Sequence, residues 1–283
     1  MRHNNPQKIL RDISRNASVF PYIFWMAAFI LIPLIIIAVY GFQTMDGNFT
    51  MDNILSIANP VNRKALFLSI KLSLISTVIC LILAYPLAMI LAHMQMKRSS
   101  FIIFIFILPM WMNFLLRTIA WQTLLEKNGV INTLLSALHL PELNMINTSG
   151  AIVLGMVYNF LPFMILPIYN TLIKINQDTL NAARDLGANG FQTFVKITLP
   201  LSIPGIISGI TMVFVPALTT FVISDLLGGS KILLIGNVIE QEFMSAYNWN
   251  LGSGLSLVLM IFIILSMALM SKYDKNGEGA LNI

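Results

Sequence analysis

The sequence predicts an all-α integral membrane protein with about six transmembrane helices. Of its 283 residues, 57% are apolar and only 10% are charged, and the mean hydropathy is +0.80. A soluble domain carries about a quarter charged residues, so this chain could not cover a globule with a wetted surface. Long apolar stretches follow one another in series without an intervening soluble region. We therefore interpret the chain as one membrane domain.

Six stretches are long enough to cross the hydrocarbon core, which takes roughly 20 apolar residues in a helix. The first lies in a run without a charged side chain, from Asn16 to Met45. This run is too long for a cleaved signal peptide and no small-residue cleavage site follows it, so we interpret it as a retained anchor. The predicted spans are about Ser18–Phe42, Ala65–Leu91, Phe101–Gln122, Gly150–Ile173, Leu201–Ile223 and Leu251–Met270.

Basic side chains sort by side of the membrane. Most lie in the N-terminal tail, the loops after spans two and four, and the C-terminal tail: Arg2, Lys8, Arg11, Arg15, Lys97, Arg98, Lys174, Arg184, Lys196, Lys272 and Lys275. The positive-inside rule then places both termini in the cytoplasm. The loops on the opposite side are more acidic. Either these carboxylates are ordinary solvated surface groups, or they interact with partners or substrate.

Several classes of site are missing from the sequence. It has no GxxxxGK[ST] phosphate loop, so we expect no nucleotide site in this chain. Histidines and carboxylates form no metal-ligand cluster, and the single cysteine, Cys80, allows neither a disulfide nor a thiolate site. The sequence also shows no nucleophile paired with a base, the arrangement that would indicate catalysis. The net charge of +5 follows membrane topology and does not require a nucleic-acid partner.

The connection at 174–200, between spans four and five, is too structured for a plain linker. Asp178 is a suitable N-cap for a short helix, and Gly187 is suited to end that helix in a left-handed conformation. A second short helix, carrying Phe191, would end at Pro200. The apolar face of such a helix pair needs something to bury against.

This connection resembles the EAA motif of MetI-type ABC-importer permeases. Ala182-Ala183, Gly187, Ile197 and Leu199-Pro200 stand at the motif's spacing. In that family the motif forms the coupling helices that sit in a groove on the cytoplasmic ATPase. The resemblance implies a MetI-like permease fold and an ATPase-coupling role for Asn181, Ala182, Ala183, Gly187, Ile197, Leu199 and Pro200.

One position departs from the family pattern. The family usually has Glu at the first motif position, where this chain has Asn181. With Asp178 as N-cap, residue 181 would be the third helical position, where Glu completes a capping box. Asn181 can form a local hydrogen bond at that position but brings no charge.

The resemblance extends to the permease subunits of spermidine/putrescine importers. It rests on the stretches Ser224–Lys231 and Leu234–Ile239, and on Ile107–Asn113 with Leu116-Arg117 in span three. It implies a division into three parts: 1–64, with the first helix and first outer loop; a permease core at 65–272; and a tail at 273–283.

The same resemblance implies partners and a location. The partners would be a second related permease subunit, two cytoplasmic ATPase subunits that bind ATP and Mg, and an extracytoplasmic polyamine-binding protein. The chain itself would hold no cofactor, and it would span the bacterial plasma membrane several times.

Polar residues within spans are functional candidates, because they are costly in lipid. Aromatic faces and carboxylates attract the ammonium groups of a polycation. The candidate substrate path is therefore Trp111, Asn113, Tyr158, Asn159 and Asp225. Structural alternatives stay open: Trp111 packing on a partner helix, Tyr158 bonding a neighbouring helix, and Asp225 capping a helix or facing solvent.

Two further features of the spans are structural. Arg117 has the wrong charge for a cation site and is expected to snorkel or to pair with an acidic group. Gly205 and Gly209 form a GxxxG spacing, which favours close helix packing.

Other functions compete with this interpretation. A permease for another small solute, such as an anion, is the nearest alternative. A membrane-embedded enzyme lacks a catalytic constellation, and a stand-alone secondary transporter would not use an ATPase-docking loop.

Overall fold

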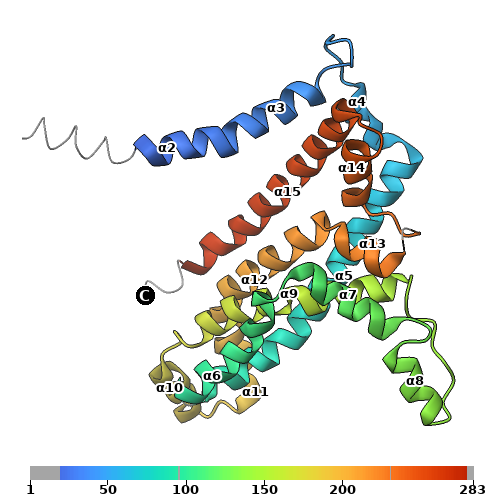
Figure 1. The fold of residues 1–283 in the computed structure, drawn as a ribbon. Helices are drawn as coiled ribbons and strands as arrows, with labels where there is room; N and C mark the ends of the chain where they lie inside the picture. The colour runs from blue at the N-terminus through green and yellow to red at the C-terminus, as the bar shows by residue number, and fades with distance from the viewer. Residues whose placement is uncertain (1–19, 95, 230, 279–283) are drawn as a thin grey trace, which may run out of the picture. The chain divides into compact units, whose positions relative to one another are not determined.

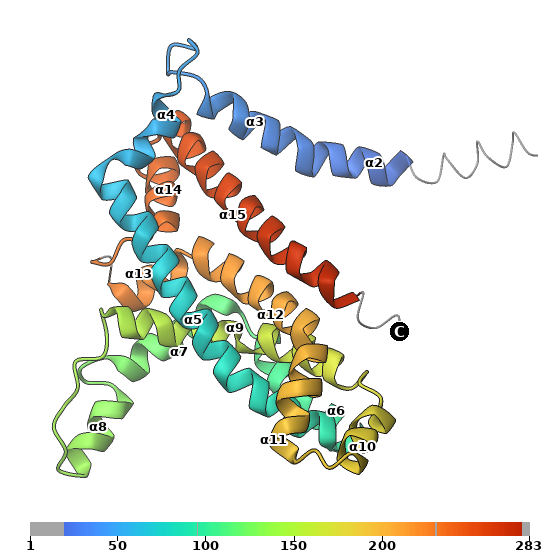
Figure 2. The same cartoon turned by 180° about the vertical axis from the view of Figure 1, so that it is seen from behind.

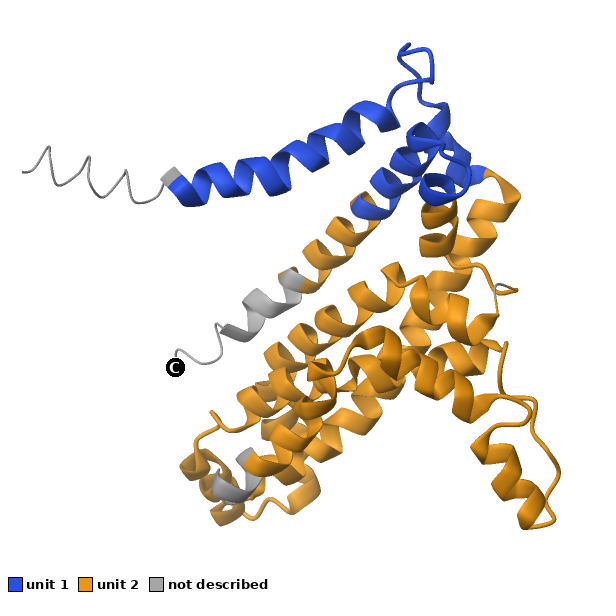
Figure 3. Ribbon diagram, viewed as in Figure 1, with its two compact units in different colours: residues 1–58, 242–260 blue, residues 59–241, 261–283 orange. Residues whose placement is uncertain are grey.

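The computed structural model describes residues 20–94, 96–229 and 231–278, and within them the chain is helical apart from loops and one isolated bridge between Gln43 and Phe49. The chain divides into two compact units (Figure 3). Unit 1 comprises residues 1–58 and 242–260, and unit 2 comprises residues 59–241 and 261–283.

The transmembrane prediction is confirmed in type and approximate number. Five helices of the described chain are long and apolar enough to span a membrane: Pro21–Gly41, Pro60–His93, Ser149–Leu172, Gly190–Thr219 and Trp249–Met270. A sixth candidate is a helix pair bent by 91°, Phe101–Trp111 with Phe114–Ala137.

Three long helices form the centre of unit 2 (Figures 1 and 2). They are α5 (Pro60–His93), α9 (Ser149–Leu172) and α12 (Leu199–Thr219). Their contacts include a 2.8 Å hydrogen bond between the hydroxyls of Tyr85 and Ser202.

The GxxxG spacing in α12 allows its close approach to α9. A β-carbon added at Gly205 would lie 2.8 Å from the carbonyl oxygen of Pro167, and one added at Gly209 would lie 2.7 Å from the sulfur of Met164. The packing predicted for these glycines is confirmed.

Span three is broken, so the prediction of one continuous helix from 101 to 122 is wrong. Helix α6 (Met96–Ile107) runs into a 3-10 turn, Leu108–Trp111, and α7 (Phe114–Leu125) then starts in a new direction. Asn113 caps α7, because its Oδ1 accepts from the backbone N–H of Leu115 at 2.8 Å. A side chain that caps a new helix competes with continuation of the old one. Helix α8 (Val130–Ala137) follows.

Span five differs from its prediction at both ends. Its helix begins with α11 (Gly190–Thr193) and a π-helical turn, Phe194–Thr198, and continues into α12 without a stop at Pro200. A proline lacks an N–H and its ring crowds the carbonyl four residues earlier, and the preceding wider turn accommodates both effects. The helix ends at Thr219, because Thr220 is extended.

A short helix, α13 (Val222–Gly228), follows the break at Thr220. Asp225 therefore lies in α13, beyond the end of span five at Thr219. Helix α14 (Ile235–Met244) follows α13.

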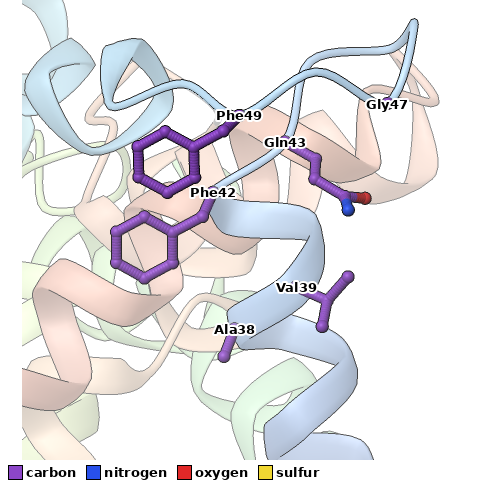
Figure 4. A pocket seen from close by; sticks show the side chains of 6 residues that line it. All are labelled: Ala38, Val39, Phe42, Gln43, Gly47 and Phe49. Atoms are coloured by element: carbon purple, nitrogen blue, oxygen red, sulfur yellow. The ribbon is translucent and has the colours of Figure 1, made fainter.

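Unit 1 holds α2 (Phe20–Met26), a π-helical turn (Ala27–Leu31), α3 (Ile32–Gly41), α4 (Asp52–Leu55), a 3-10 turn (Ser56–Ala58), the end of α14 and the first part of α15 (Trp249–Glu278). A hairpin at 42–50 follows α3. Phe42 and Phe49 stack across it, with ring centroids 5.9 Å apart and planes 5° from parallel (Figure 4). These rings line a cavity of about 440 Å³ together with Ala38, Val39, Gln43 and Gly47.

Candidate functional site

The first helix of the 174–200 segment, here called the coupling loop, is α10 (Gln177–Asp185). Its N-cap is Asn176, whose Oδ1 accepts from the N–H of Asp178 at 2.8 Å. The prediction of Asp178 as N-cap is therefore wrong. Asp178 lies in the first turn, where its charge complements the helix dipole. Asn181 consequently lies too deep in α10 for the capping-box position.

Gly187 ends α10 as predicted. Its φ is +85°, in the left-handed region that favours glycine. Its N–H donates to the carbonyl of Arg184 at 2.8 Å, and the N–H of Ala188 donates to that of Ala183 at 3.0 Å. This pair of bonds is the Schellman motif, which satisfies the last carbonyls of a helix. No atom lies within 4 Å of an added β-carbon, so the requirement for glycine is conformational rather than steric.

A full capping box starts α11 and was missed in the sequence. The Oδ1 of Asn189 accepts from the N–H of Gln192 at 2.8 Å, and the Oε1 of Gln192 accepts from the N–H of Asn189 at 3.0 Å. The signal was present as Asn followed three residues later by Gln. Both short helices of the coupling loop therefore start with a side-chain cap, and α10 also ends in a Schellman motif, whereas α11 continues into the π-helical turn.

The motif residues of α10 lie on different sides of the helix. Ala183 is only 7% exposed, and Leu180 is buried as well, so both face the interior. Ala182 and Asn181 are exposed. Of the two motif alanines, Ala183 therefore lies with Leu180 on the buried side of α10, and Ala182 lies on the exposed side.

Two large apolar side chains flank the Gly187 corner and point away from the core. Leu186 is 89% exposed and Phe191 is 75% exposed. Single exposed apolar residues are ordinary, but two large ones beside one rigid corner make an unpaired apolar surface. Sequence reasoning did not single out Leu186, although its place directly before the capping glycine was visible.

The last residues of the motif belong to the span. Leu199 packs partly buried against the core, Ile197 is half-buried and Pro200 is exposed. These residues connect the loop covalently to α12 through the continuous helix that starts at Gly190.

Both aromatic residues of the predicted substrate path pack against another ring. Trp111 is exposed at the bend of span three, with its ring edge-on to Phe104 at 5.8 Å. Tyr158 packs edge-on to Trp121, with centroids 5.3 Å apart.

The two asparagines of the predicted path have structural contacts. Asn113 caps α7, as described above. Asn159 is buried and turns back on its own helix, donating from Nδ2 to the carbonyl of Gly155 at 2.9 Å. Its Oδ1 is buried without a hydrogen-bond partner.

Asp225 lies in a polar hub that sequence reasoning missed. Its Oδ1 accepts from Nδ2 of Asn237 at 2.7 Å, and that same Nδ2 donates to the carbonyl of Phe221 at 3.1 Å. The Oδ1 of Asn237 accepts from the Ser224 hydroxyl at 2.6 Å and from the Leu234 N–H at 3.0 Å. Asn237 is fully buried and joins α13 to α14. The only sequence signal was one amide inside an apolar run.

Burial raises the pKa of the Asp225 carboxyl above its ordinary value, and the hydrogen bond from Asn237 partly opposes this effect. The ionised form is disfavoured because partial burial removes water from the charge. A cation beside the free oxygen would favour the ionised form.

Arg117 departs from both expectations. Its side chain is buried, and its Nε has no hydrogen-bond partner. Within the part of the chain that the structure describes, it forms no ion pair, so the expected pairing with an acidic group is absent there.

Comparison with known proteins gives one consistent family. Residues 84–275 match the family model described as binding-protein-dependent transport system inner membrane component. The chain is 38% identical over 266 residues to the spermidine/putrescine transport system permease protein PotB of Haemophilus influenzae, covering 91% of this chain and 93% of that protein. It is 38% identical over 245 residues to PotB of Escherichia coli K12, covering 84% of this chain and 89% of that protein.

Solved structures agree at the level of the fold. A chain of a bacterial ABC transporter involved in the import of the acidic polysaccharide alginate superposes with a TM-score of 0.81 at 17% identity, covering 95% of this chain and 98% of that chain. A chain of the MetNI methionine ABC transporter superposes with a TM-score of 0.57 at 16% identity, covering 75% of this chain and 94% of that chain. The chain therefore has a MetI-type permease fold and belongs to the family of inner membrane components of binding-protein-dependent transport systems.

Proposed function

We propose that this chain is the transmembrane permease subunit of an ABC importer that carries the polyamines spermidine and putrescine across the bacterial plasma membrane. The observation that carries the proposal is the 38% identity to PotB of Haemophilus influenzae over 91% of this chain. A permease for another small solute is the alternative, since the fold also matches importers of an acidic polysaccharide and of methionine.

ATP hydrolysis is assigned to separate ATPase subunits, two per complex, which would bind the ATP and Mg. The remaining partners are a second, related permease subunit and an extracytoplasmic polyamine-binding protein. The exposed pair Leu186 and Phe191 supports ATPase docking at the coupling loop, because a loop whose short helices both start with a side-chain cap displays apolar side chains that the described chain does not cover.

The coupling loop is assigned to the cytoplasmic side, together with both termini. This assignment is supported by the basic side chains of the loop: Lys174, Arg184 and Lys196 are all exposed. Docking on a cytoplasmic ATPase requires the same orientation.

Asp225 is the best-supported substrate-path residue among those proposed from sequence. One of its oxygens is held by Asn237, and its partial burial makes a cationic partner favourable. Trp111 and Tyr158 keep exposed ring surface for ammonium groups. Asn113 and Asn159 are assigned structural roles, because one caps α7 and the other bonds its own helix.

Uptake of labelled spermidine and putrescine tests the proposal in cells with and without this chain. We expect uptake above background only with the chain present, and its loss when the partner ATPase carries an inactive nucleotide site. If cells with and without the chain took up both polyamines at the same rate, the assigned substrate class would be contradicted.

A further inference from the structure

Three aromatic side chains of unit 1 converge on one cavity that contains none of the residues singled out above. Tyr40 lies at the end of α3, Tyr247 lies in the segment before α15, and Trp249 starts α15. Together with Met45 and Asn250 they line a cavity of about 360 Å³. This volume lies within the range of small-molecule sites, roughly 300–1,000 Å³. We call the three rings the aromatic cage.

The cage rests on a hydrogen-bonded frame. Nδ2 of Asn250 donates to the carbonyls of Gln43 at 2.8 Å and Tyr40 at 3.2 Å, which ties the end of α3 to the start of α15. The hairpin at 42–50 follows Tyr40 directly, and the rings of Phe42 and Phe49 stack across it (Figure 4).

The rings of the cage are tilted relative to one another. The centroids of Tyr40 and Trp249 are 6.5 Å apart, with planes 47° from parallel. Phe243 forms a T-shaped contact with Trp249, with centroids 5.8 Å apart and planes at 83°.

Tyr247 has an unusual backbone for its residue type. Its φ is +53°, a conformation that costs a residue with a β-carbon, yet its side chain is 74% exposed and gains little from burial. Strained backbone of this kind is concentrated at binding sites and active sites.

We propose that the aromatic cage binds an ammonium group of an alkylamine substrate. The proposal rests on the polyamine function given above. Ring faces carry the negative part of the aromatic quadrupole and attract cations within about 6 Å of the centroid. None of the residues that line the cavity is basic, so nothing in its lining repels a cation.

Aromatic residues also gather at membrane interfaces as a belt, and Tyr40 and Trp249 lie at span ends where a belt would place them. A belt explains the position of each ring separately. It explains neither the convergence of three rings on one cavity nor the positive φ of Tyr247.

The test is spermidine binding to the purified full-length complex in lipid nanodiscs. We expect Trp249→Leu and Tyr247→Leu each to weaken binding about fivefold, the equivalent of about 1 kcal/mol, and Trp249→Phe to weaken it less than Trp249→Leu. Tetramethylammonium, which carries charge but donates no hydrogen bond, should compete in the wild type and lose potency in both leucine variants.

Trp25 supplies a matched control, because it is 54% exposed, as Trp249 is, and lies in the first span away from the cage. Trp25→Leu should leave binding unchanged, and an equal loss in this variant would overturn the cage in favour of a belt. Unchanged binding in both Trp249→Leu and Tyr247→Leu, in a complex whose cells take up spermidine, would overturn the cage alone. No chain-dependent uptake in the wild type would instead overturn the polyamine function, and the cage with it.

Discussion

Two connecting segments of unit 2 are built in opposite ways. The segment 220–238, which carries the polar hub, fully buries four large apolar side chains: Ile223, Leu227, Leu234 and Ile235 have no exposed surface. The coupling loop has side-chain caps at the start of both short helices but leaves Leu186 and Phe191 exposed. The hub segment packs most of its large apolar side chains inside the unit, whereas the coupling loop displays an uncovered apolar surface.

This difference predicts where substitutions act. Changes in the hub segment should lower stability, because its interactions lie within the fold. Changes to the exposed side chains of the coupling loop should spare stability and weaken association with a partner.

The largest expected effect on stability belongs to Asn237→Leu. Leucine has a similar size but removes the partner of the Leu234 N–H and of the Asp225 carboxyl, while the Ser224 hydroxyl keeps the Phe221 carbonyl as its acceptor. Each buried group left unpaired costs about 1–3 kcal/mol, so a clear fall in thermal unfolding temperature is expected. Asn181→Leu, at an exposed position of α10, is the control and should leave that temperature nearly unchanged. Equal unfolding temperatures for the two variants would contradict the claim that the hub stabilises the fold.

Two adjacent alanines lie on opposite sides of α10, so matched substitutions can test which side is buried. Ala183→Asp places a carboxylate at a position 7% exposed, so it should destabilise the coupling loop by about 1–3 kcal/mol. Ala182→Asp puts the same group at an exposed position and should stay within about 0.5 kcal/mol. Hydrogen exchange of the loop amides measures both. Faster exchange in Ala182→Asp than in Ala183→Asp would show that the faces are reversed.

The smallest stability effect is expected for Asp225→Asn. The pKa of Asp225 is raised, so its ionised form opposes folding at neutral pH, and this cost disappears as pH falls below the pKa of the unfolded chain. Asn keeps the acceptor for Asn237 and removes the cost. The variant should therefore be slightly more stable at neutral pH and equal to wild type in acid.

Transport should respond to Asp225→Asn in the opposite direction. Wild-type uptake should fall on acidification. The fall should begin at a pH above the pKa of an ordinary aspartate, because the raised pKa of Asp225 makes it lose its charge there. The variant should transport less at neutral pH and show a weaker pH dependence. Identical pH profiles for the wild type and Asp225→Asn would show that Asp225 has no role in transport beyond its contact with Asn237.

The sequence predicted features that depend on local chemistry and composition. The spans followed from apolar length, and the left-handed Gly187 followed from the helix that it ends. The bend in span three was not predicted, because hydropathy is the same on both sides of the break, although Pro109 and Asn113 marked the place.

Features set by tertiary packing could not be predicted from local patterns. Ala182 and Ala183 are chemically identical, and only packing decides which of them is buried. The hub joins Asn237 to groups 12 to 16 residues earlier, and the cage joins residues more than 200 positions apart. Neither arrangement leaves a spacing that sequence reasoning recognises.

The central claim, that the coupling loop is incomplete without an ATPase, is tested most directly by the double variant Leu186→Asp, Phe191→Asp. The measurement is the amount of ATPase that co-purifies with the chain, alongside the thermal unfolding temperature. Burying a side chain of this size contributes about 1.5–3 kcal/mol, so losing both should weaken association more than tenfold while the unfolding temperature stays unchanged. The control, Gln177→Asp with Thr179→Asp, adds the same charge at exposed polar positions of the loop and should retain the ATPase. Wild-type association in the double variant Leu186→Asp, Phe191→Asp would contradict the account.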